Sequence, residues 1–341
     1  MEILNKILFF LLILCMITSS AVGMTVIQNT VPAITADPSN TSTAVVEIEF
    51  PFKDDVVLGE VTLHLSPYNG AKAQSAKSVS LFGCSPEQYY SAIANDPAQD
   101  EMYAELLGFF DVYAKHHDLT SDEYVELLTT YVQNIPYKTV GAAVNFPIET
   151  VIENKGDCDD KSVLLAGLLT KSGYAAGVVV FSEENHMTAA IKETETGHVI
   201  SSYVLIETTR YAYIGENAAV IRSRTRNRTR IGEDSVILVG GGTAVYTAAW
   251  QVDAILNQRD GIVETIDSLS QEMRTLKTEI IGQEAQLSQA YDPAVYEKYE
   301  ENLTSYNEYM ETCYAYIDEL NVINTGSYSR EETYEMVASM M

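Results

Sequence analysis

The C-terminal region carries a repeat of apolar side chains that restricts it to one kind of structure. Apolar residues recur there at steps of four and three, at Ile262, Ile266, Leu269, Met273, Leu276 and Ile280. This spacing places them along one face of an α-helix. After Asp292-Pro293 a second series follows with similar steps: Tyr296, Tyr299, Leu303, Tyr306, Met310, Cys313, Ile317 and Leu320. Two helices with matching apolar faces and a proline-bearing turn predict an antiparallel helical hairpin over residues 241–341.

The start of the chain has the layout of an export signal. Lys6 is followed by an apolar run over 7–17 and then by small residues that end at Gly23. This order predicts a signal peptide over 1–23, cleaved after Gly23. An uncleaved anchor is the alternative, because the apolar run is not far below spanning length. We therefore expect an exported protein, outside the cell or at its surface, with membrane association only through this N-terminal segment.

Composition divides the chain between these two segments into three regions. Residues 24–43 are rich in Thr, Asn and Pro and have no apolar period, which predicts a flexible stalk. Residues 44–84 predict a small β region with three strand-like runs, at 45–50, 60–65 and 77–82. Residues 85–240 predict a helical lead-in followed by a mixed domain.

Helix signals open this third region and strand signals close it. Ser85-Pro86 is a good helix start, and Thr120 with Glu123 has the spacing of a capping box. Strand-like runs dominate from about 176 to 239 and stop at Gly240-Gly241-Gly242, which predicts a hinge. Together with the C-terminal hairpin, these signals predict an α+β fold.

Net charge and cysteine content exclude several classes of protein. The chain has 48 acidic and 21 basic residues and a formal net charge of −27, so nucleic acid is not expected as a partner. Three cysteines follow the N-terminal segment, and this odd number argues against a disulfide scaffold. Cys313 lies on the hairpin seam and is expected to be a packing thiol. Neither zinc-site nor calcium-loop spacing occurs, so no metal or other cofactor is expected.

Cys158 stands among three aspartates in the stretch GDCDDKSVLL. The preceding residues 145–155 look like a loop and the following apolar residues predict a buried helix, so Cys158 falls in its first turn. Unpaired amide N–H groups and the helix dipole favour a thiolate at that position. The aspartates oppose it by repulsion unless Lys161 or an imidazolium offsets their charge. The alternative is a half-buried cysteine near a helix cap.

His186 is the histidine best placed to act as a base for this thiol. His64 and His198 alternate with polar neighbours and look like surface positions. His116-His117 lie at a helix end, where they suit the helix dipole. His186 opens an apolar strand after a polar loop, where a cleft residue would lie, although a structural histidine is the alternative there.

The geometry of a β-hairpin predicts that Glu207 lies close to His186. Strands over 186–192 and 202–208 flank a natural turn at Thr196-Gly197. A symmetric hairpin places Glu207 directly opposite His186, with Cβ atoms roughly 5 Å apart. The carboxylate could then orient the imidazole and complete a set of nucleophile, base and orienting group. A solvent-facing carboxylate is the alternative.

An ordered set of motifs lies within residues 121–215. It consists of IPYKT (135–139), FPIETVIENKGDCDDKSVLLAGLLTKSGY (146–174), HMTAAI (186–191) and YVLIETT (203–209). This set resembles the microbial transglutaminase-like domain, a relative of the papain-type cysteine proteases. The resemblance implies a nucleophile helix packed on an antiparallel sheet that bears the base. It also implies Cys158 as nucleophile, His186 as base and Glu207 as orienting acid, where the family often has Asp.

The chemistry that this set implies is acyl transfer through a thioester. Cys158 attacks a carbonyl carbon, and His186 takes the thiol proton and later donates a proton to the leaving amine. The backbone N–H of Cys158 is expected to stabilise the oxyanion, with Gln133 or Tyr137 as candidates for a second donor. Water is the default acceptor, so hydrolysis is expected rather than cross-linking.

Two further features of the sequence concern its surface. Residues 222–230 carry five arginines at alternate positions, on one face of a strand. They could dock an anionic partner, although an exposed face that offsets or pairs with the acidic remainder is the simpler interpretation. Glycosylation sequons occur at Asn40, Asn227 and Asn302.

We therefore expect an exported cysteine peptidase or amidase that acts on a peptide or protein substrate through Cys158, His186 and Glu207. One alternative is a non-catalytic transglutaminase-like module that binds or scaffolds partners at the cell surface. Another is a structural surface protein that assembles through its tyrosine-rich helical hairpin. The hairpin is in either case a candidate site for a protein partner.

Overall fold

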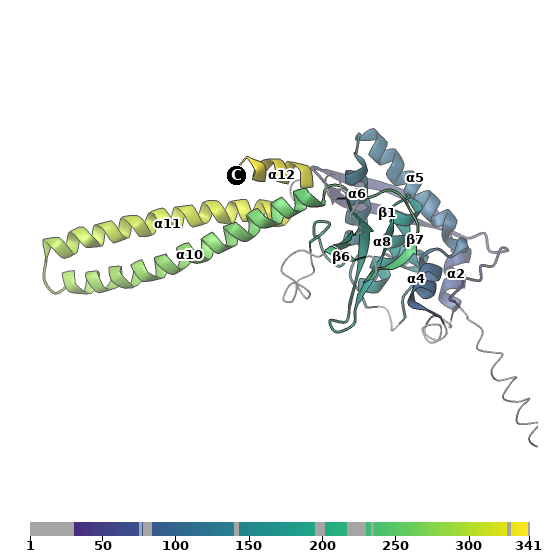
Figure 1. Ribbon diagram of the computed structural model, residues 1–341, viewed down its shortest axis with the longest axis horizontal. Helices are drawn as coiled ribbons and strands as arrows, with labels where there is room; N and C mark the ends of the chain where they lie inside the picture. Colours follow the sequence, from purple (N-terminus) through teal and green to yellow (C-terminus); the bar gives the residue numbers. More distant parts are fainter. Residues whose placement is uncertain are drawn as a thin grey trace, which may run out of the picture.

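The chain forms a mixed α+β domain from which a long helical hairpin projects (Figure 1). The computed structural model describes residues 31–74, 77, 84–139, 143–194, 202–216, 230–232, 235–325 and 329–339. This arrangement confirms the α+β class and the C-terminal helical pair that the sequence predicts. The segment predicted as a signal or anchor, residues 1–23, lies outside the described residues.

A two-stranded antiparallel ribbon opens the described domain. Its strands are β1 (Thr43–Phe52) and β2 (Asp55–His64). Alternate side chains of β1 are buried, and they include Val46, Ile48, Phe50 and Phe52. This period of two matches a ribbon with one face on the core, formed here by α5 and α6. The predicted runs at 45–50 and 60–65 are therefore confirmed as strands, except that Leu65 begins the helix α2 (Leu65–Ala73). The third run, at 77–82, lies mostly outside the described residues.

Residues 31–42 have no helix or strand, but they are not the free stalk that their composition predicts. The backbone N–H of Ile34 donates to Asp96 Oδ2 at 2.7 Å. Ser66 Oγ donates to the carbonyl oxygen of Asp37 at 2.6 Å. These long-range hydrogen bonds hold the segment against the domain, which a local composition signal does not reveal.

Three helices and a short 3-10 turn form the predicted lead-in: α4 (Pro86–Ala94), η1 (Pro97–Gln99), α5 (Asp100–His116) and α6 (Ser121–Asn134). Both predicted helix starts are confirmed. Ser85 Oγ accepts from Gln88 N at 3.2 Å. Thr120 Oγ1 accepts from Glu123 N at 3.3 Å, and Glu123 Oε2 accepts from Thr120 N at 2.8 Å. Such reciprocal caps satisfy amide groups that the first helical turn leaves unpaired.

A short helix precedes the predicted nucleophile helix. Residues 145–155 were expected to be a loop, but Pro147 occupies the first position of α7 (Pro147–Glu153). A proline suits that position because its missing N–H has no helical partner there. The helix ends at Asn154, whose φ of 45° is left-handed. The loop prediction is therefore wrong over most of this segment.

Helix α8 (Cys158–Lys171) forms the centre of the domain and packs on a five-stranded sheet. The sheet is antiparallel with the order β6-β5-β4-β3-β7. Its strands are β3 (Ala176–Phe181), β4 (His186–Lys192), β5 (Ser202–Ile206), β6 (Arg230–Gly232) and β7 (Ile237–Gly240). The apolar side chains of α8 are fully buried, and they include Val163, Leu164, Leu165, Leu168 and Leu169. Burial of each such side chain contributes roughly 1.5–3 kcal/mol, so this helix is held rigidly.

The glycine run at 240–242 is packed rather than hinged. The backbone N–H groups of Thr243 and Ala244 both donate to the carbonyl oxygen of Gly173, each at 3.1 Å. A side chain at Gly242 would collide with the same carbonyl and with the backbone of Tyr174. Glycine is needed here for close approach of two backbones and not for free rotation.

The hairpin consists of α10 (Ala249–Leu287) and α11 (Pro293–Thr325), and α12 (Arg330–Ala338) returns to the domain. At its base, Tyr213 packs with Val252, Ile255 and other apolar side chains of these helices. Arg259 Nη1 pairs with Glu216 Oε1 at 2.8 Å, and both side chains are buried. The hairpin is thus joined to the domain by an apolar cluster and a buried ion pair.

Along the hairpin, the predicted seam is correct on α10 and partly wrong on α11. Ile262 and Ile280 are buried, whereas Leu303 is 37 % exposed. Asn302 faces the partner helix instead, and its Nδ2 donates to Glu279 Oε2 at 2.9 Å. An apolar repeat fixes a helical face only within about one residue, and a polar contact here selects the neighbouring position.

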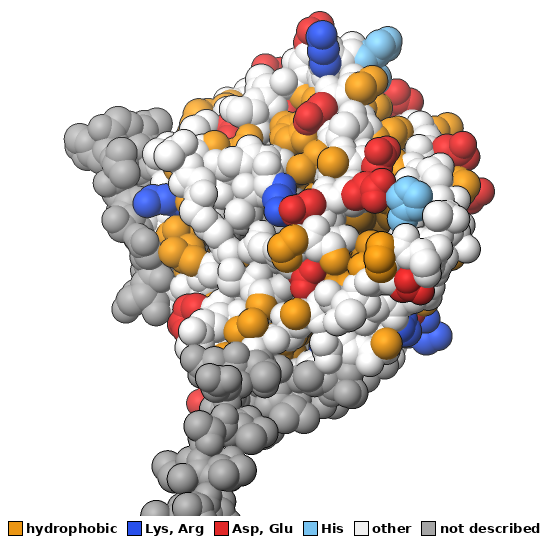
Figure 2. Space-filling view, turned by 90° about the vertical axis from the view of Figure 1, so that its right-hand side faces the viewer, with side chains coloured by type: hydrophobic (Ala, Val, Ile, Leu, Met, Phe, Trp, Pro, Cys, Tyr) orange, Lys and Arg blue, Asp and Glu red, His pale blue; other side chains and the backbone are white. Residues whose placement is uncertain are grey.

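The end of the domain opposite the hairpin shows how the excess acidic charge is distributed. Acidic side chains are scattered over this face among small apolar patches (Figure 2).

Within the described residues, no helix combines the length and apolar character needed to cross a bilayer.

Candidate active site

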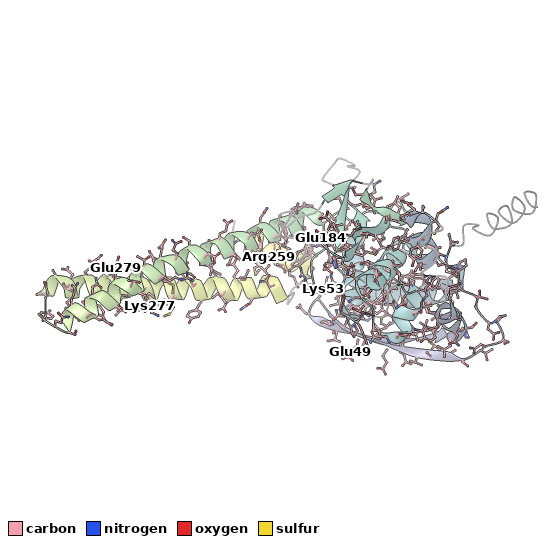
Figure 3. The ribbon with its side chains drawn as sticks, turned by 90° about the horizontal axis from the view of Figure 1, so that it is seen from below. Glu49, Lys53, Glu184, Arg259, Lys277 and Glu279 are labelled. Atoms are coloured by element: carbon pink, nitrogen blue, oxygen red, sulfur yellow. The ribbon has the colours of Figure 1, made fainter. Side chains whose placement is uncertain are left out.

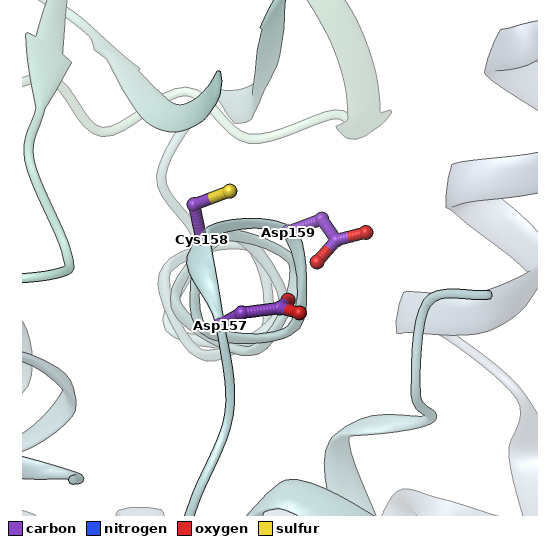
Figure 4. Close-up of side chains that lie close together, drawn as sticks. All are labelled: Asp157, Cys158 and Asp159. Atoms are coloured by element: carbon purple, nitrogen blue, oxygen red, sulfur yellow. The ribbon is translucent and has the colours of Figure 1, made fainter. Parts of the chain in front are cut away.

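Cys158 is the first residue of α8, and its side chain is half-buried beside those of Asp157 and Asp159 (Figure 4). Asp160, the third residue of the helix, holds this first turn in place: its Oδ1 accepts from Asn145 N at 2.7 Å and its Oδ2 accepts from Asn145 Nδ2 at 3.1 Å. The N–H of Asp157 also points to Asp160 Oδ2, at 3.4 Å. These contacts fix the thiol at the amino end of a buried helix, as the sequence predicts.

His186 and Glu207 meet beside this thiol. His186 is the first residue of β4, and Glu207 directly follows β5. The His186 Nε2 lies 3.1 Å from Glu207 Oε2, and the carboxylate is almost fully buried. The imidazole also lies close enough to Cys158 for the two side chains to interact. Because Nε2 is engaged by Glu207, Nδ1 is the ring nitrogen left for the thiol.

The pKa values of this pair shift in opposite directions. Burial alone would lower the pKa of His186, but its interactions with Cys158 and Glu207 outweigh burial and raise the pKa to about 9. Burial alone would raise the pKa of Glu207, but hydrogen bonds from His186 and Thr209 lower it to about 2. At neutral pH the site therefore holds an imidazolium between a carboxylate and the sulfur of Cys158.

The aspartates beside Cys158 repel a thiolate less than their number suggests. Burial raises the pKa of the Asp159 carboxyl, and the neighbouring Asp157 carboxylate raises it further through a hydrogen bond and its charge. Because that pKa rises to about 8, the Asp159 carboxyl is largely neutral at pH 7, which reduces the negative charge near the sulfur. Lys161 does not offset the negative charge of these aspartates, because its ammonium group forms hydrogen bonds at the end of α6.

The predicted register of the hairpin is wrong by two residues. Symmetric pairing would place Ala189 opposite Val204, but Ala189 pairs with Ile206. Because side chains alternate along a strand, a shift of two residues keeps the same face toward the site. His186 and Glu207 are consequently diagonal neighbours, and their long side chains close the remaining gap.

Several supporting residues were not found from the sequence. Thr209 donates to Glu207 Oε1 through its N–H at 2.8 Å and its hydroxyl at 2.6 Å. Tyr90 comes from α4, which packs against α8, and burial together with the charges of Asp159 and Cys158 raises its pKa to about 12. The Thr209 contact is local and could be read from its spacing to Glu207. The Tyr90 contact joins distant parts of the chain, and no sequence pattern signals it.

Lys161 is a buried cation in the same helix. Its Nζ donates to the carbonyl oxygens of Gln133 at 3.1 Å and Ile135 at 2.7 Å, and its side chain is fully buried. Burial lowers its pKa to about 8, although the charge of Glu207 acts in the opposite direction. Lys161 therefore joins the nucleophile helix to the end of α6.

One of the two suggested oxyanion donors is already occupied. Gln133 Nε2 donates to the carbonyl oxygens of Glu207 at 2.8 Å and Ala212 at 2.9 Å. Tyr137 stays a candidate, since its backbone lies beside Gly156 and its half-exposed side chain senses the charge of Cys158.

The other histidines and surface motifs lie apart from this cluster. His64 is exposed and lies 3.5 Å from Glu101, while His116 and His117 are exposed at the end of α5. His198, Asn227 and most of the arginine stretch at 222–230 lie outside the described residues. Asn40 is half-buried, and Asn302 is buried between the hairpin helices, where a glycan would not fit.

Metal binding was not expected, but one group of ligand atoms is close enough to consider. The side-chain ligand atoms of Asp157, Cys158 and Asp159 lie within 4.8 Å of one another. A thiolate and two carboxylates could hold a divalent cation, but burial raises the pKa of the Asp159 carboxyl to about 8, which disfavours the charged form that a cation needs. No disulfide joins Cys84, Cys158 or Cys313, the cysteines of the described residues.

Comparisons of the chain with protein-family profiles, curated proteins and solved structures gave no match. The candidate site is therefore argued from its own geometry.

Proposed function

We propose that this chain is a thiol-dependent acyl-transfer enzyme, a cysteine peptidase or amidase, that uses Cys158, His186 and Glu207. The observation that carries the proposal is the imidazole of His186, which contacts Cys158 and is held at 3.1 Å by the buried Glu207. A nucleophile, a proton carrier and an orienting carboxylate in this order form the general set for covalent acyl transfer.

The papain- and transglutaminase-like core is part of the same proposal. It is supported by a nucleophile helix, α8, that packs on antiparallel strands β3 and β4, the second of which begins with the base. The motif resemblance over residues 121–215 supports it as well. Export to the cell surface is proposed from the N-terminal segment alone.

In the first half of the reaction, the sulfur of Cys158 attacks the carbonyl carbon of an amide. A C–S bond forms, and the carbonyl oxygen becomes an oxyanion that the N–H of Cys158 can stabilise, because the first turn of a helix leaves its amides unpaired. The C–N bond then breaks, and the proton on His186 moves to the leaving amine. The products are a thioester on Cys158 and a free amine.

In the second half, a water molecule attacks the thioester. His186, now neutral, accepts a proton from the water as the new C–O bond forms. The C–S bond breaks and a carboxylic acid leaves, which restores the thiolate and the imidazolium. Throughout this cycle Glu207 keeps the ring oriented and stabilises its positive form.

The reactivity of the thiol tests this proposal before any substrate is known. Iodoacetamide should alkylate Cys158 at pH 7 at least about tenfold faster than Cys84 or Cys313, because the imidazolium of His186 favours the reactive thiolate form of its neighbour. His186→Gln should remove this advantage. Mass spectrometry of each cysteine-containing peptide measures the three rates in one sample.

A matched control separates this effect from a general loss of charge. His64 also lies beside a glutamate but far from Cys158, so His64→Gln should leave all three rates unchanged. Equal, slow alkylation of all cysteines in the unaltered chain would refute the activated thiol and favour the non-catalytic binding module. If the thiol is activated, hydrolysis of a peptide-amide library should disappear in Cys158→Ala.

A further inference from the structure

Ser162 lies one helical turn after Cys158 on α8, and its side chain is fully buried. Residues four apart on a helix are neighbours on one face, so Ser162 lies on the same face of α8 as Cys158. Its Oγ donates to the carbonyl oxygen of Met187 at 3.2 Å and lies 3.2 Å from Thr208 Oγ1. One buried hydroxyl group therefore joins α8 to β4 and to the segment that follows β5.

These two contacts lie next to the other members of the candidate triad. Met187 directly follows His186 at the start of β4, and Thr208 directly follows Glu207 after the end of β5. Because consecutive Cα atoms are only about 3.8 Å apart, a restraint on one residue restricts the position of its neighbour. Ser162 thus connects the three segments that carry the nucleophile, the base and the orienting carboxylate.

The direction of both hydrogen bonds follows from the groups involved. A backbone carbonyl oxygen can only accept, so the single hydroxyl proton of Ser162 is used by Met187. The hydroxyl of Thr208 must then donate to Ser162 Oγ. Both hydroxyl groups belong to fully buried side chains, so the loss of either one removes a hydrogen bond that water cannot replace.

The pairing of β4 with β5 does not reach the candidate triad. The last pair of residues in this ladder is Ala189 and Ile206, and both His186 and Glu207 lie beyond it. His186 also follows a largely exposed turn that contains Glu184, which is labelled in Figure 3. Contacts other than the hydrogen bonds of this ladder must therefore fix the separation of the two residues.

Two of these other contacts hold each residue to a different part of the domain. Gln133 Nε2 donates to the carbonyl oxygen of Glu207 and so holds it to α6. His186 pairs with Phe181 and is thus held to β3. Neither contact involves the helix of the nucleophile. The hydrogen bonds of Ser162 supply that connection for both segments.

We propose that Ser162, together with Thr208, is a positioning residue of the candidate site. Their two hydrogen bonds keep the imidazole of His186 and the carboxylate of Glu207 at a fixed distance from the sulfur of Cys158, and they touch none of the reacting atoms. This inference rests on the proposed function, because it takes the three residues to act as one set.

The pH dependence of Cys158 alkylation by iodoacetamide tests this role in the full-length chain. The midpoint of the profile reports how strongly the imidazolium favours the thiolate, whereas the maximum rate reports how accessible the sulfur is. Ser162→Ala removes both hydrogen bonds and should raise the midpoint by about 0.3 to 1 pH unit, which corresponds to the value of one hydrogen bond. A purely structural role would change the maximum rate and leave the midpoint in place.

Thr208 provides a matched pair of variants, which decides the question if Ser162→Ala does not fold. Thr208→Val removes the hydroxyl with little change of shape and should raise the midpoint. Thr208→Ser keeps the hydroxyl and should restore the midpoint of the unaltered chain. As a control, Ser172→Ala removes a serine hydroxyl that donates to the carbonyl oxygen of Leu168 at 2.9 Å, at the far end of α8, and should not move the midpoint. Far-UV circular dichroism shows whether each variant is folded.

Three results would overturn the inference, and they can be told apart. If Cys158 is activated in the unaltered chain but Thr208→Val has the same midpoint, the hydroxyl groups have no positioning role and the proposed function still stands. A change of the maximum rate alone would assign the bridge to packing. If Cys158 of the unaltered chain reacts no faster than Cys84 and Cys313, the proposed function fails and the positioning role fails with it.

Discussion

The proton on His186 is the most direct test of the electrostatics of the candidate site. Its pKa of about 9 lies above the ordinary value of 6.5. At about 1.4 kcal/mol per unit, this shift amounts to about 3 kcal/mol in favour of the imidazolium in the folded protein. The gain comes from two partners, Cys158 and Glu207, which together outweigh the opposing effect of burial.

Glu207→Gln removes one of these partners with little change of shape. The amide can still contact the ring but no longer carries a negative charge, so we expect the pKa of His186 to fall by about one to two units. Because the folded pKa is raised, the stabilisation is complete below pH 6.5 and is lost as pH rises through about 9. In Glu207→Gln this loss should occur at lower pH and be smaller.

NMR titration of the imidazole C–H signals measures this pKa directly. His186→Gln identifies the signal, because the signal disappears in that variant. A His186 midpoint near 6.5 in the unaltered chain, or one that does not move in Glu207→Gln, would refute the proposed ion pair.

Two further predictions concern the fold around the site, and chemical denaturation measures both. Arg259→Met should destabilise the chain by about 3 kcal/mol, because it removes the buried cation from Glu216. The same variant should make the hairpin base more sensitive to proteolysis, and unchanged sensitivity would contradict its proposed role as an anchor. Gly242→Ala should cost about 1–3 kcal/mol, because the added methyl group collides with the backbone at Gly173. Gly241→Ala, with open space around it, should have little effect, and equal losses in both variants would refute the packing argument.

Local sequence signals were sufficient for most of the helices and for the strand that carries His186. The capping boxes at Ser85 and Thr120 involve side chains only three residues from their partners, so their hydrogen bonds can be read from spacing. The strand predicted at 186–192 has those bounds in the structure. The first turn of α8 also begins at Cys158, as its unpaired amides and following apolar run predict.

Long-range contacts decided the strand register and the buried face of the hairpin, which local signals did not specify. The register between β4 and β5 depends on packing across the whole sheet, and the symmetric estimate was wrong by two residues even though the correct face was predicted. In the hairpin, Asn302 and not the predicted Leu303 faces the partner helix, because Glu279 on that helix accepts a hydrogen bond from Asn302.

The sequence by itself thus determined the α+β class and the helical hairpin, and it predicted the three residues of the candidate site. Only the tertiary structure could pack α4, with Tyr90, against the nucleophile helix α8 and join Gln133 to the backbone of Glu207. Helices form from hydrogen bonds between residues about four apart, which spacing reveals. Sites and cavities form where distant segments meet, and their geometry depends on how the whole core packs.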